Sequence, residues 1–313
     1  MSNHFSVAPG IWGCKDVFVN FYAAANNDGT WVLIDTALPT SYHVIKRVSA
    51  GIFGRDSKPA AILLTHGHFD HTGCVAKLAA EWKVPVYAHY LEFPYLTGHS
   101  CYPPPDASVG GGAMASVAWL YPNKPINIES FLYALPDDGT VPGLPGWQYI
   151  HTPGHAPGHV SFFRKKDNVL IAADAFVTTI QESLISVIRQ TKKLSGPPKY
   201  FTYDWDAAKL SVEKLAALRP KIASTGHGKP MGGVELEVAL TNLAVHFERD
   251  AVPGKGRYVN DPAVTDAGGV LYVPPKEKNY SLHIKIAATA LAVAAVTFAL
   301  IAVKKNKPKW YGR

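Results

Sequence analysis

Cysteine is scarce in this 313-residue chain, which contains only Cys14, Cys74 and Cys101. Their number is odd, and no two of them have the short spacing of metal-binding cysteines. A disulfide framework and a cysteine-bound metal are therefore both disfavoured, and a reducing compartment is favoured. The first nine residues contain no Lys or Arg and no long apolar run. We therefore expect no secretory signal.

The body of the chain also lacks an excess of charge of either sign. The formal net charge is +7, but residues 276–313 hold eight basic side chains against the single acid Glu277. Residues 1–275 contain 23 basic and 23 acidic side chains and are therefore neutral. A protein that binds nucleic acid needs a basic face on its folded domain. The charge distribution disfavours nucleic acid as a substrate or partner.

One long apolar run is present near the C-terminus. Ile286–Val303 is a stretch of 18 residues without a charge, flanked by Lys285 and by Lys304-Lys305. As a helix it would be about 27 Å long, close to the thickness of a bilayer core. The alternative is an apolar helix packed on the domain. The uninterrupted run and its basic flanks favour a single-pass membrane anchor in the tail 276–313, with the preceding domain in the cytoplasm.

The rest of the chain alternates between short apolar strands and helices. Asn26-Asn27-Asp28-Gly29 predicts a turn between the strands 17–23 and 31–36. Further strands are expected at 61–64, 86–88, 147–151, 160–164, 169–173 and 222–225, and helices at 41–49, 72–82, 204–218 and 233–249. Asp204 is the expected N-cap of its helix. This mixture predicts sheets with helices packed on them.

Residues 94–125 differ in composition from their surroundings. They contain Pro103-Pro104-Pro105, Gly110-Gly111-Gly112 and several aromatic side chains. Such a stretch is typical of an insertion between framework elements. Long irregular insertions beside a functional site often act as lids, although a plain surface excursion is an equal alternative.

The densest group of chemically active residues is Thr65–His71, which follows the apolar run 61–64. It places His66, His68, Asp70 and His71 within six residues. Imidazole and carboxylate groups are suited to zinc, and one loop after a strand can present neighbouring ligands to two ions. We interpret this segment as part of a metal site.

Four further polar residues occupy the same kind of position, just beyond an apolar strand. They are Asp35, His155, Asp174 and His227. Taken singly, each would more often be an ordinary turn residue than a ligand. Together with Thr65–His71 they form an ordered pattern of metal-binding residue types along the chain.

That pattern resembles the metallo-β-lactamase superfamily, through Thr65–His71, Thr152–His159, Ala173-Asp174 and Gly226-His227. The resemblance covers about residues 10–250. It implies an α+β fold, a four-layer αββα sandwich with the site at one edge between two sheets. We therefore expect residues 1–275 to form one catalytic domain, followed by the C-terminal apolar helix.

The resemblance also implies which residues hold two metal ions. His66, His68 and His155 would bind the first ion; Asp70, His71 and His227 would bind the second; Asp174 would bridge both. Asp35 would orient a ligand imidazole. His159, His151 and His89 are either similar orienting groups or ordinary hydrogen-bonded histidines.

These ligands predict an enzyme, a metallo-hydrolase with two zinc ions per chain, with iron or manganese as other candidate metals. Metal binding lowers the pKa of water from about 15.7 to about 7 and so provides a hydroxide nucleophile at neutral pH. Asp70 is the candidate catalytic residue, which would pass a proton to the leaving group. The expected substrate is a small molecule with an ester, lactone or thioester bond, and Tyr95, Tyr102, Trp119 and Tyr121 are candidate pocket residues.

Differences from the residue patterns of individual branches reduce the number of branches of the superfamily to which this chain could belong. One zinc class of true β-lactamases has Cys where this chain has Asp174, and lactonases commonly have Tyr where it has Val177. Glyoxalase II shares the ligand set, but no basic glutathione-binding cluster is evident. A glyoxalase II-like or lactonase-like hydrolase is the preferred interpretation. An iron-dependent persulfide dioxygenase, a phosphodiesterase or nuclease, and a membrane-tethered binding protein without turnover are the alternatives.

Overall fold

The first of two sheets is formed by the N-terminal half of the chain. The computed structural model describes residues 4–276. Seven strands follow one another in chain order across this sheet: β1 (His4–Ala8), β2 (Ile11–Asp16), β3 (Val19–Ala25), β4 (Trp31–Ile34), β5 (Ala61–Leu63), β6 (Val86–Ala88) and β7 (Leu132–Ala134). Strands β1 to β4 pair antiparallel, whereas β4 to β7 pair parallel. The parallel part is built from strand and helix crossovers.

The second sheet comes from the C-terminal half. Its strands are β8 (Trp147–His151), β9 (Val160–Arg164), β10 (Val169–Ala173), β11 (Ile222–Thr225) and β12 (Met231–Gly232). They lie in the order β12-β11-β10-β9-β8, and only the β10–β11 pair is parallel. A separate hairpin is formed by β13 (Val264–Asp266) and β14 (Gly269–Tyr272).

Nine α-helices complete the described part of the chain, with five short 3₁₀ turns. The helices are α1 (Tyr42–Phe53), α2 (Phe69–Thr72), α3 (Val75–Trp82), α4 (Phe93–Leu96), α5 (Ala113–Ser116), α6 (Leu184–Arg189), α7 (Trp205–Ala217), α8 (Gly233–Val245) and α9 (Phe247–Asp250). The 3₁₀ turns are Tyr90–Glu92, Ala107–Val109, Ala118–Leu120, Glu129–Phe131 and Lys199–Phe201. The sequence correctly predicted the α7 N-cap, since Asp204 accepts a hydrogen bond from the Ala207 N–H at 2.9 Å.

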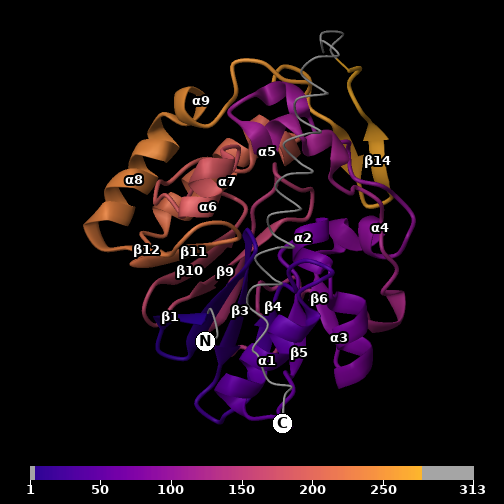
Figure 1. Ribbon diagram of the computed structural model, residues 1–313, viewed down its shortest axis with the longest axis vertical. Coiled ribbons are helices and arrows are strands. Elements are labelled where there is room, and N and C mark those ends of the chain that lie inside the picture. Colours follow the sequence, from indigo (N-terminus) through magenta and orange to yellow (C-terminus); the bar gives the residue numbers. More distant parts are fainter. Residues whose placement is uncertain (1–3, 277–313) are drawn as a thin grey trace, which may run out of the picture.

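Side chains of β4 show how the two sheets are covered on both faces. Val32 and Ile34 join a buried cluster with residues of the second sheet, including Phe162 and Ile171. The alternate residue Leu33 packs in another cluster with side chains of α1 and α3. This alternation follows from the two-residue period of a strand. The outer face of the second sheet packs against α7 and α8 (Figure 1).

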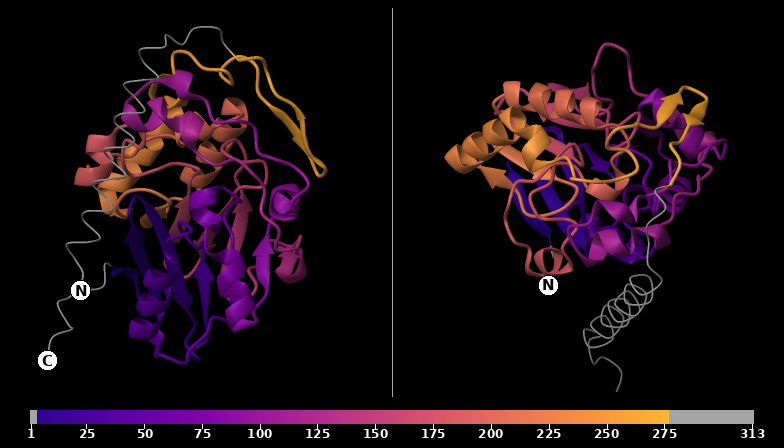
Figure 2. Two further views of the ribbon diagram at one scale, coloured as in Figure 1. Left: turned by 45° about the vertical axis from the view of Figure 1, so that its right-hand side comes forward. Right: turned by 90° about the horizontal axis from the view of Figure 1, so that it is seen from above.

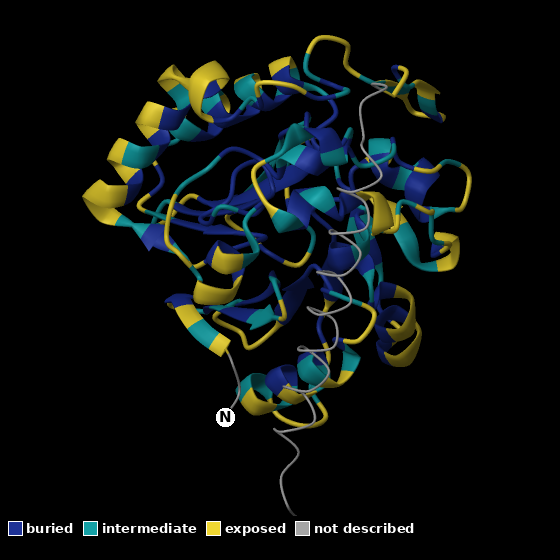
Figure 3. Cartoon of the chain, turned by 45° about the horizontal axis from the view of Figure 1, so that its top comes forward, coloured by how far each residue is buried: buried dark blue, intermediate teal, exposed yellow. Residues whose placement is uncertain are grey.

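The layers are therefore helices, first sheet, second sheet and helices, and the prediction of a mixed fold of sheets and helices is confirmed. Figure 2 shows the same arrangement from two other directions. Central strands such as β4, β9 and β10 are buried, whereas the outward faces of helices such as α8 are exposed (Figure 3).

The helix predicted at 72–82 is divided into α2 and α3. Gly73 stands at the break, and its N–H donates to the Ala37 carbonyl at 2.8 Å. A Cβ at this position would lie 2.2 Å from the Pro39 nitrogen, so only glycine allows the two backbone segments to approach. The predicted helix 233–249 is likewise interrupted, at His246, between α8 and α9.

The insertion 94–125 is held against the last described segment of the chain. The buried Asp106 carboxylate accepts from the Arg257 N–H at 2.6 Å, and the Tyr258 hydroxyl donates to the Pro104 carbonyl at 2.7 Å. The Val270 N–H of β14 donates to Ser100 Oγ at 3.1 Å. The sequence did not predict the hairpin β13–β14 that makes this last contact. These hydrogen bonds fix the insertion to residues 257–270.

The predicted membrane anchor requires a correction. Within residues 4–276, none of the helices combines the length and the apolar character needed to cross a bilayer. The predicted apolar helix at 286–303 and the tail 276–313, apart from Lys276, lie outside the described residues. The membrane and transmembrane assignment and the single-pass localisation rested on the apolar run and its basic flanks, and the described part of the chain does not support them.

Candidate metal centre

The candidate ligands lie on loops that leave neighbouring strands at one edge of the two sheets. The Thr65–His71 loop follows β5, Asp174 follows β10, and Gly226-His227 follow β11. Asp35 directly follows β4 and Ala173 is the last residue of β10, and their φ values of 61° and 46° mark a sharp turn at the end of each strand. Such positive φ values are uncommon outside glycine and often occur at functional sites. The turns direct successive loops toward a common point.

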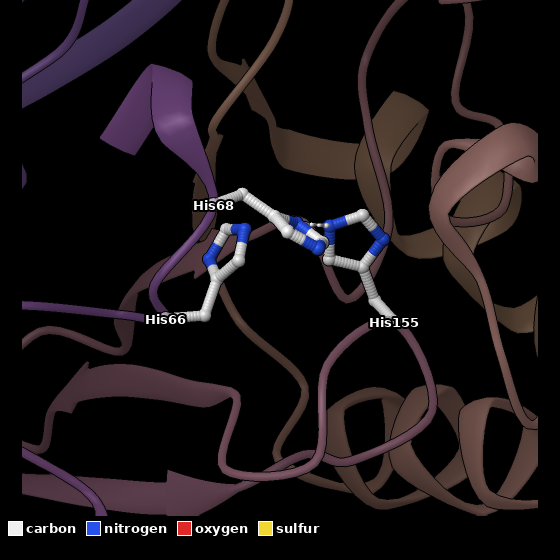
Figure 4. A group of neighbouring side chains, drawn as sticks. All are labelled: His66, His68 and His155. Carbon is white, nitrogen blue, oxygen red and sulfur yellow. Dashed lines mark hydrogen bonds between the residues drawn. The ribbon is translucent and has the colours of Figure 1, made fainter. Parts of the chain in front are cut away.

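The first group comprises His66, His68 and His155 (Figure 4). All three side chains are buried, and one ligand atom from each lies within 4.8 Å of the others. Nδ1 of His68 is 3.0 Å from Nε2 of His155. Nε2 of His66 is buried and has no hydrogen-bond partner among the described residues. Three imidazole nitrogens therefore converge on one small volume.

The second group comprises Asp70, His71 and His227, again with one ligand atom from each within 4.8 Å of the others. Asp70 and His71 belong to α2, whereas His227 lies in the loop after β11. Oδ2 of Asp70 is 3.6 Å from Nε2 of His227. The fold thus brings together residues separated by more than 150 positions.

Asp174 lies between the two groups. Its Oδ2 is 3.5 Å from Nε2 of His155, 3.6 Å from Nε2 of His71 and 3.1 Å from Nε2 of His227. With His66 and His71 it forms a third candidate ligand group. Asp174 is therefore placed to serve both of the other groups. All seven residues expected to be ligands lie together.

Hydrogen bonds on the outer side of the rings fix which nitrogen faces inward. The Thr65 hydroxyl donates to Asp35, so it can accept from Nδ1 of His66 at 3.0 Å. Nδ1 of His71 is 2.8 Å from Oδ2 of Asp35, and Nδ1 of His227 is 2.8 Å from the Phe18 carbonyl. With a proton on Nδ1 donated to these acceptors, Nε2 of each neutral ring faces the cluster and can donate an electron pair to a metal.

His68 has the opposite arrangement. Its Nε2 is 3.0 Å from the Tyr203 hydroxyl, whereas its Nδ1 faces His155. A proton on Nε2 leaves Nδ1 free to bind a metal. Each of these four rings thus has a partner that orients it, as is usual for histidines that ligate metals.

The pKa shifts differ between the histidines of the first group and His71 of the second group. Burial, reinforced by neighbouring imidazoles, lowers the pKa of His66 and His68 well below the usual range and lowers that of His155 to about 3. These rings are therefore neutral at pH 7, the state that binds a metal. Burial alone would also lower the pKa of His71. The carboxylates of Asp35 and Asp174 outweigh this effect and raise the pKa of His71 well above its usual range.

The donor set fits divalent metal ions. Buried atoms without a partner among the described residues include Nε2 of His66, Nε2 of His71 and Oδ1 of Asp174. A buried polar atom left unpaired is costly, and a cation at this place would satisfy all three. Imidazole nitrogens with carboxylate oxygens suit zinc, iron or manganese.

The other histidines singled out in the sequence take different places. Nε2 of His159 accepts from the Asp174 N–H at 3.1 Å, and its Nδ1 is 2.8 Å from the Thr152 hydroxyl. His159 therefore supports the backbone at Asp174. His89 and His151 stack on each other with ring centroids 4.1 Å apart and belong to none of the ligand groups.

Sequence reasoning missed several residues that touch the site. Tyr203 and the Phe18 carbonyl orient ligand rings, and Phe201 stacks on His68 with ring centroids 4.5 Å apart. Glu92 accepts from the Gly67 N–H at 2.8 Å, and so does Tyr102, which the sequence offered only as a pocket residue, at 2.9 Å. None of these residues lies within a recognisable motif.

Comparison with known proteins identifies the family. The sequence model of the metallo-β-lactamase superfamily matches residues 14–227. The chain belongs to the metallo-β-lactamase superfamily. The match extends from the first sheet to the last candidate ligand, His227, and therefore includes all seven residues of the cluster. The prediction of an enzyme of metallo-hydrolase type is confirmed.

Curated relatives within the superfamily agree with this assignment. The chain is 43% identical over 242 residues to "Probable metallo-hydrolase YflN" of Bacillus subtilis, an alignment that covers 77% of this chain and 92% of that protein. A more distant relative is "Hydroxyacylglutathione hydrolase GloC" of Haemophilus influenzae, 28% identical over 138 residues and covering 41% of this chain and 59% of that protein. This distant match gives only weak support to the glyoxalase II-like branch.

Solved structures of the superfamily share the fold. A subclass B3 metallo-β-lactamase of Bradyrhizobium japonicum superimposes with a TM-score of 0.52 at 22% identity, covering 79% of this chain and 92% of that one. A metallo-β-lactamase family protein of Thermus thermophilus gives 0.53 at 20% identity, covering 78% of this chain and 81% of that one. These likenesses show the fold of the superfamily.

Proposed function

We propose that this protein is a two-metal hydrolase that cleaves an ester, lactone or thioester bond of a small substrate. One observation carries the proposal: two buried groups of three ligand residues lie on either side of a single carboxylate, Asp174, which approaches histidines of both. A site of this kind holds two ions near each other, as hydrolytic two-metal sites require.

The proposed ligand assignment follows the two groups. His66, His68 and His155 would hold the first ion, Asp70, His71 and His227 the second, and Asp174 both. Zinc is the proposed metal because it takes imidazole and carboxylate ligands in compact sites; iron and manganese accept the same donors. Bound zinc would supply Lewis acidity and lower the pKa of water to about 7.

The chain's own residues contribute orientation and proton transfer. Asp35 holds both the His71 ring and the Thr65 backbone N–H, which is 2.8 Å from Oδ1. Asp70 is the proposed catalytic residue, because its Oδ2 lies at the second group beside Nε2 of His227. From this position it would hold a proton and deliver it to the leaving group.

A cavity beside the insertion is the proposed substrate pocket. It encloses about 320 Å³, and its lining includes Trp119, Tyr121, Asn123 and Arg257. The Tyr121 ring is 5.9 Å from that of Phe201, which in turn stacks on His68. Aromatic side chains thus extend from the cavity wall to a proposed ligand. A substrate with an apolar body fits this lining.

Trp119→Ala is expected to raise KM about tenfold with little change in kcat. The ring lines the cavity but belongs to none of the ligand groups, so its loss would weaken substrate binding by about 1.4 kcal/mol and leave the chemical step intact. Leu120→Ala is the matched control, because both side chains are 46% exposed but Leu120 does not line the cavity. An equal change of KM in both variants would contradict this pocket.

The proposed function is tested by metal analysis combined with a substrate panel. Purified protein loaded with zinc should contain about two ions per chain and hydrolyse at least one member of a panel of esters, lactones and thioesters. One iron per chain with oxygen uptake would indicate a persulfide dioxygenase instead. Turnover confined to phosphodiesters would indicate the nuclease branch, and bound metal without turnover of any substrate would favour a binding protein.

A further inference from the structure

We infer that Glu92 is a positioning residue that holds the two loops carrying His66, His68 and His155 at the separation needed to bind a metal ion. The inference rests on the two-metal site proposed above. Nothing in the sequence pattern of the ligands points to Glu92, which lies outside the ligand motifs at the end of a short 3₁₀ turn, Tyr90–Glu92. Its contacts, however, reach both of the loops.

The carboxylate of Glu92 is fully buried and joins the loops through their backbones. Its Oε2 accepts from the Gly67 N–H at 2.8 Å, and its Oε1 accepts from the Gly158 N–H at 2.6 Å. Gly67 stands between His66 and His68, and Gly158 lies three residues after His155. One side chain therefore connects two segments that are about 90 positions apart in the sequence.

The Glu92 carboxyl group is held by three hydrogen-bond donors and has no charged partner among the described residues. The Tyr102 hydroxyl also donates to Oε2, and none of the ion pairs between described residues involves Glu92. Burying a carboxylate is expensive unless hydrogen bonds compensate it. Two backbone donors and a hydroxyl provide that compensation only while both loops remain in place.

Both glycines are needed for the close approach of this side chain. A Cβ on Gly67 would lie 3.2 Å from Oε2 of Glu92 and 2.7 Å from the Tyr102 hydroxyl, and a Cβ on Gly158 would lie 2.8 Å from Cγ of Glu92. Neither glycine has a positive φ, so the requirement is for space rather than for an unusual backbone conformation. The two loops are thus shaped to fit the carboxylate.

Loss of the Glu92 contacts should affect the first ligand group, His66, His68 and His155, more than the second. The 3.0 Å separation between Nδ1 of His68 and Nε2 of His155 spans the two loops that Glu92 joins. The Val160 N–H also donates to the Thr65 carbonyl, so the loops share a second connection that preserves the fold. Loss of the Glu92 contacts would therefore change the geometry of the first ligand group without unfolding the domain.

The test compares zinc binding by the wild-type protein and by Glu92→Gln. The amide has the shape of the carboxylate, but its NH₂ group would face one of the two backbone N–H donors, so one loop is released. Competition with a chromophoric chelator should show that the affinity of one zinc site falls about 10- to 100-fold, as for other groups that orient ligands, while the other site is unchanged. In the cobalt(II)-substituted protein, the absorption bands of that one site should shift.

Glu182→Gln is the matched control. Glu182 is another buried carboxylate, and it accepts from the Lys199 N–H at 2.9 Å but contacts neither ligand loop. Its replacement should leave both zinc affinities at the wild-type value. Tyr102→Phe is a second probe if Glu92→Gln yields no soluble protein, and it should weaken the same site by a smaller factor.

The outcomes separate this inference from the proposed function. Wild-type affinity at both sites in Glu92→Gln would overturn the positioning role and leave the two-metal hydrolase standing. An equal loss at both sites would also overturn it, because that result indicates general damage to the fold. A wild-type protein that takes up no zinc, iron or manganese would overturn the proposed function, and the inference with it.

Discussion

Replacing Asp174 by alanine is expected to lower kcat by about three orders of magnitude while the protein still folds. Oδ2 of Asp174 lies within 3.6 Å of Nε2 atoms from His71, His155 and His227, so its removal takes a ligand from both proposed ions at once. Effects of this size are common when a residue acts as part of a catalytic unit. Steady-state kinetics and zinc analysis would measure the loss, with the zinc content falling from two toward one per chain.

Asp204→Ala provides the comparison for Asp174. Asp204 caps α7 through the Ala207 N–H and belongs to none of the ligand groups. Its loss should lower the free energy of unfolding by about 1 kcal/mol while zinc content and kcat stay at the wild-type values. Full turnover in Asp174→Ala would remove Asp174 from the proposed site.

The ligand cluster is largely predictable from the sequence because its members stand where strands end. His66, His68, Asp70 and His71 occupy one loop after β5, so the chain itself guarantees that they lie near one another. Asp174 and His227 each follow a strand of the second sheet. These strands of the two sheets end at the same edge of the sandwich. Residues that follow these strands therefore lie close together, although they are far apart in the sequence.

The residues that orient the ligands could not be predicted in the same way. Tyr203 and Glu92 are single side chains outside any motif, and they meet the cluster only through tertiary folding. Phe18 acts through its backbone carbonyl, to which its residue type gives no clue. Such partners come together only in the folded protein.

The sequence also could not show which aromatic residues of the insertion line a cavity. Tyr95 and Tyr102 are buried, stack on each other with ring centroids 3.9 Å apart and do not line the proposed pocket. Trp119 and Tyr121 do line that cavity. Composition shows that aromatic rings are present, but it does not show which of them face a cavity and which form the core.

Zinc is expected to raise the melting temperature of metal-free protein by about 10 °C. Binding to the folded state at a concentration a thousandfold above Kd stabilises it by about 4 kcal/mol, and a domain of this size gains roughly 2–4 °C for each kcal/mol. The physical source is the set of buried, unpaired atoms at His66, His71 and Asp174, which a cation would satisfy. Thermal unfolding of chelator-treated protein with and without added zinc measures the shift.

Magnesium separates specific binding from a general effect of divalent cations. Magnesium favours oxygen ligands and octahedral geometry, whereas five of the seven proposed ligands are imidazoles, so magnesium should leave the melting temperature unchanged. Asp174→Ala should show a smaller rise with zinc than the wild-type protein, because one ligand of each proposed ion is missing. Equal melting temperatures with and without zinc would mean that the buried imidazoles are held by the fold alone, and the two-metal site would then have to be abandoned.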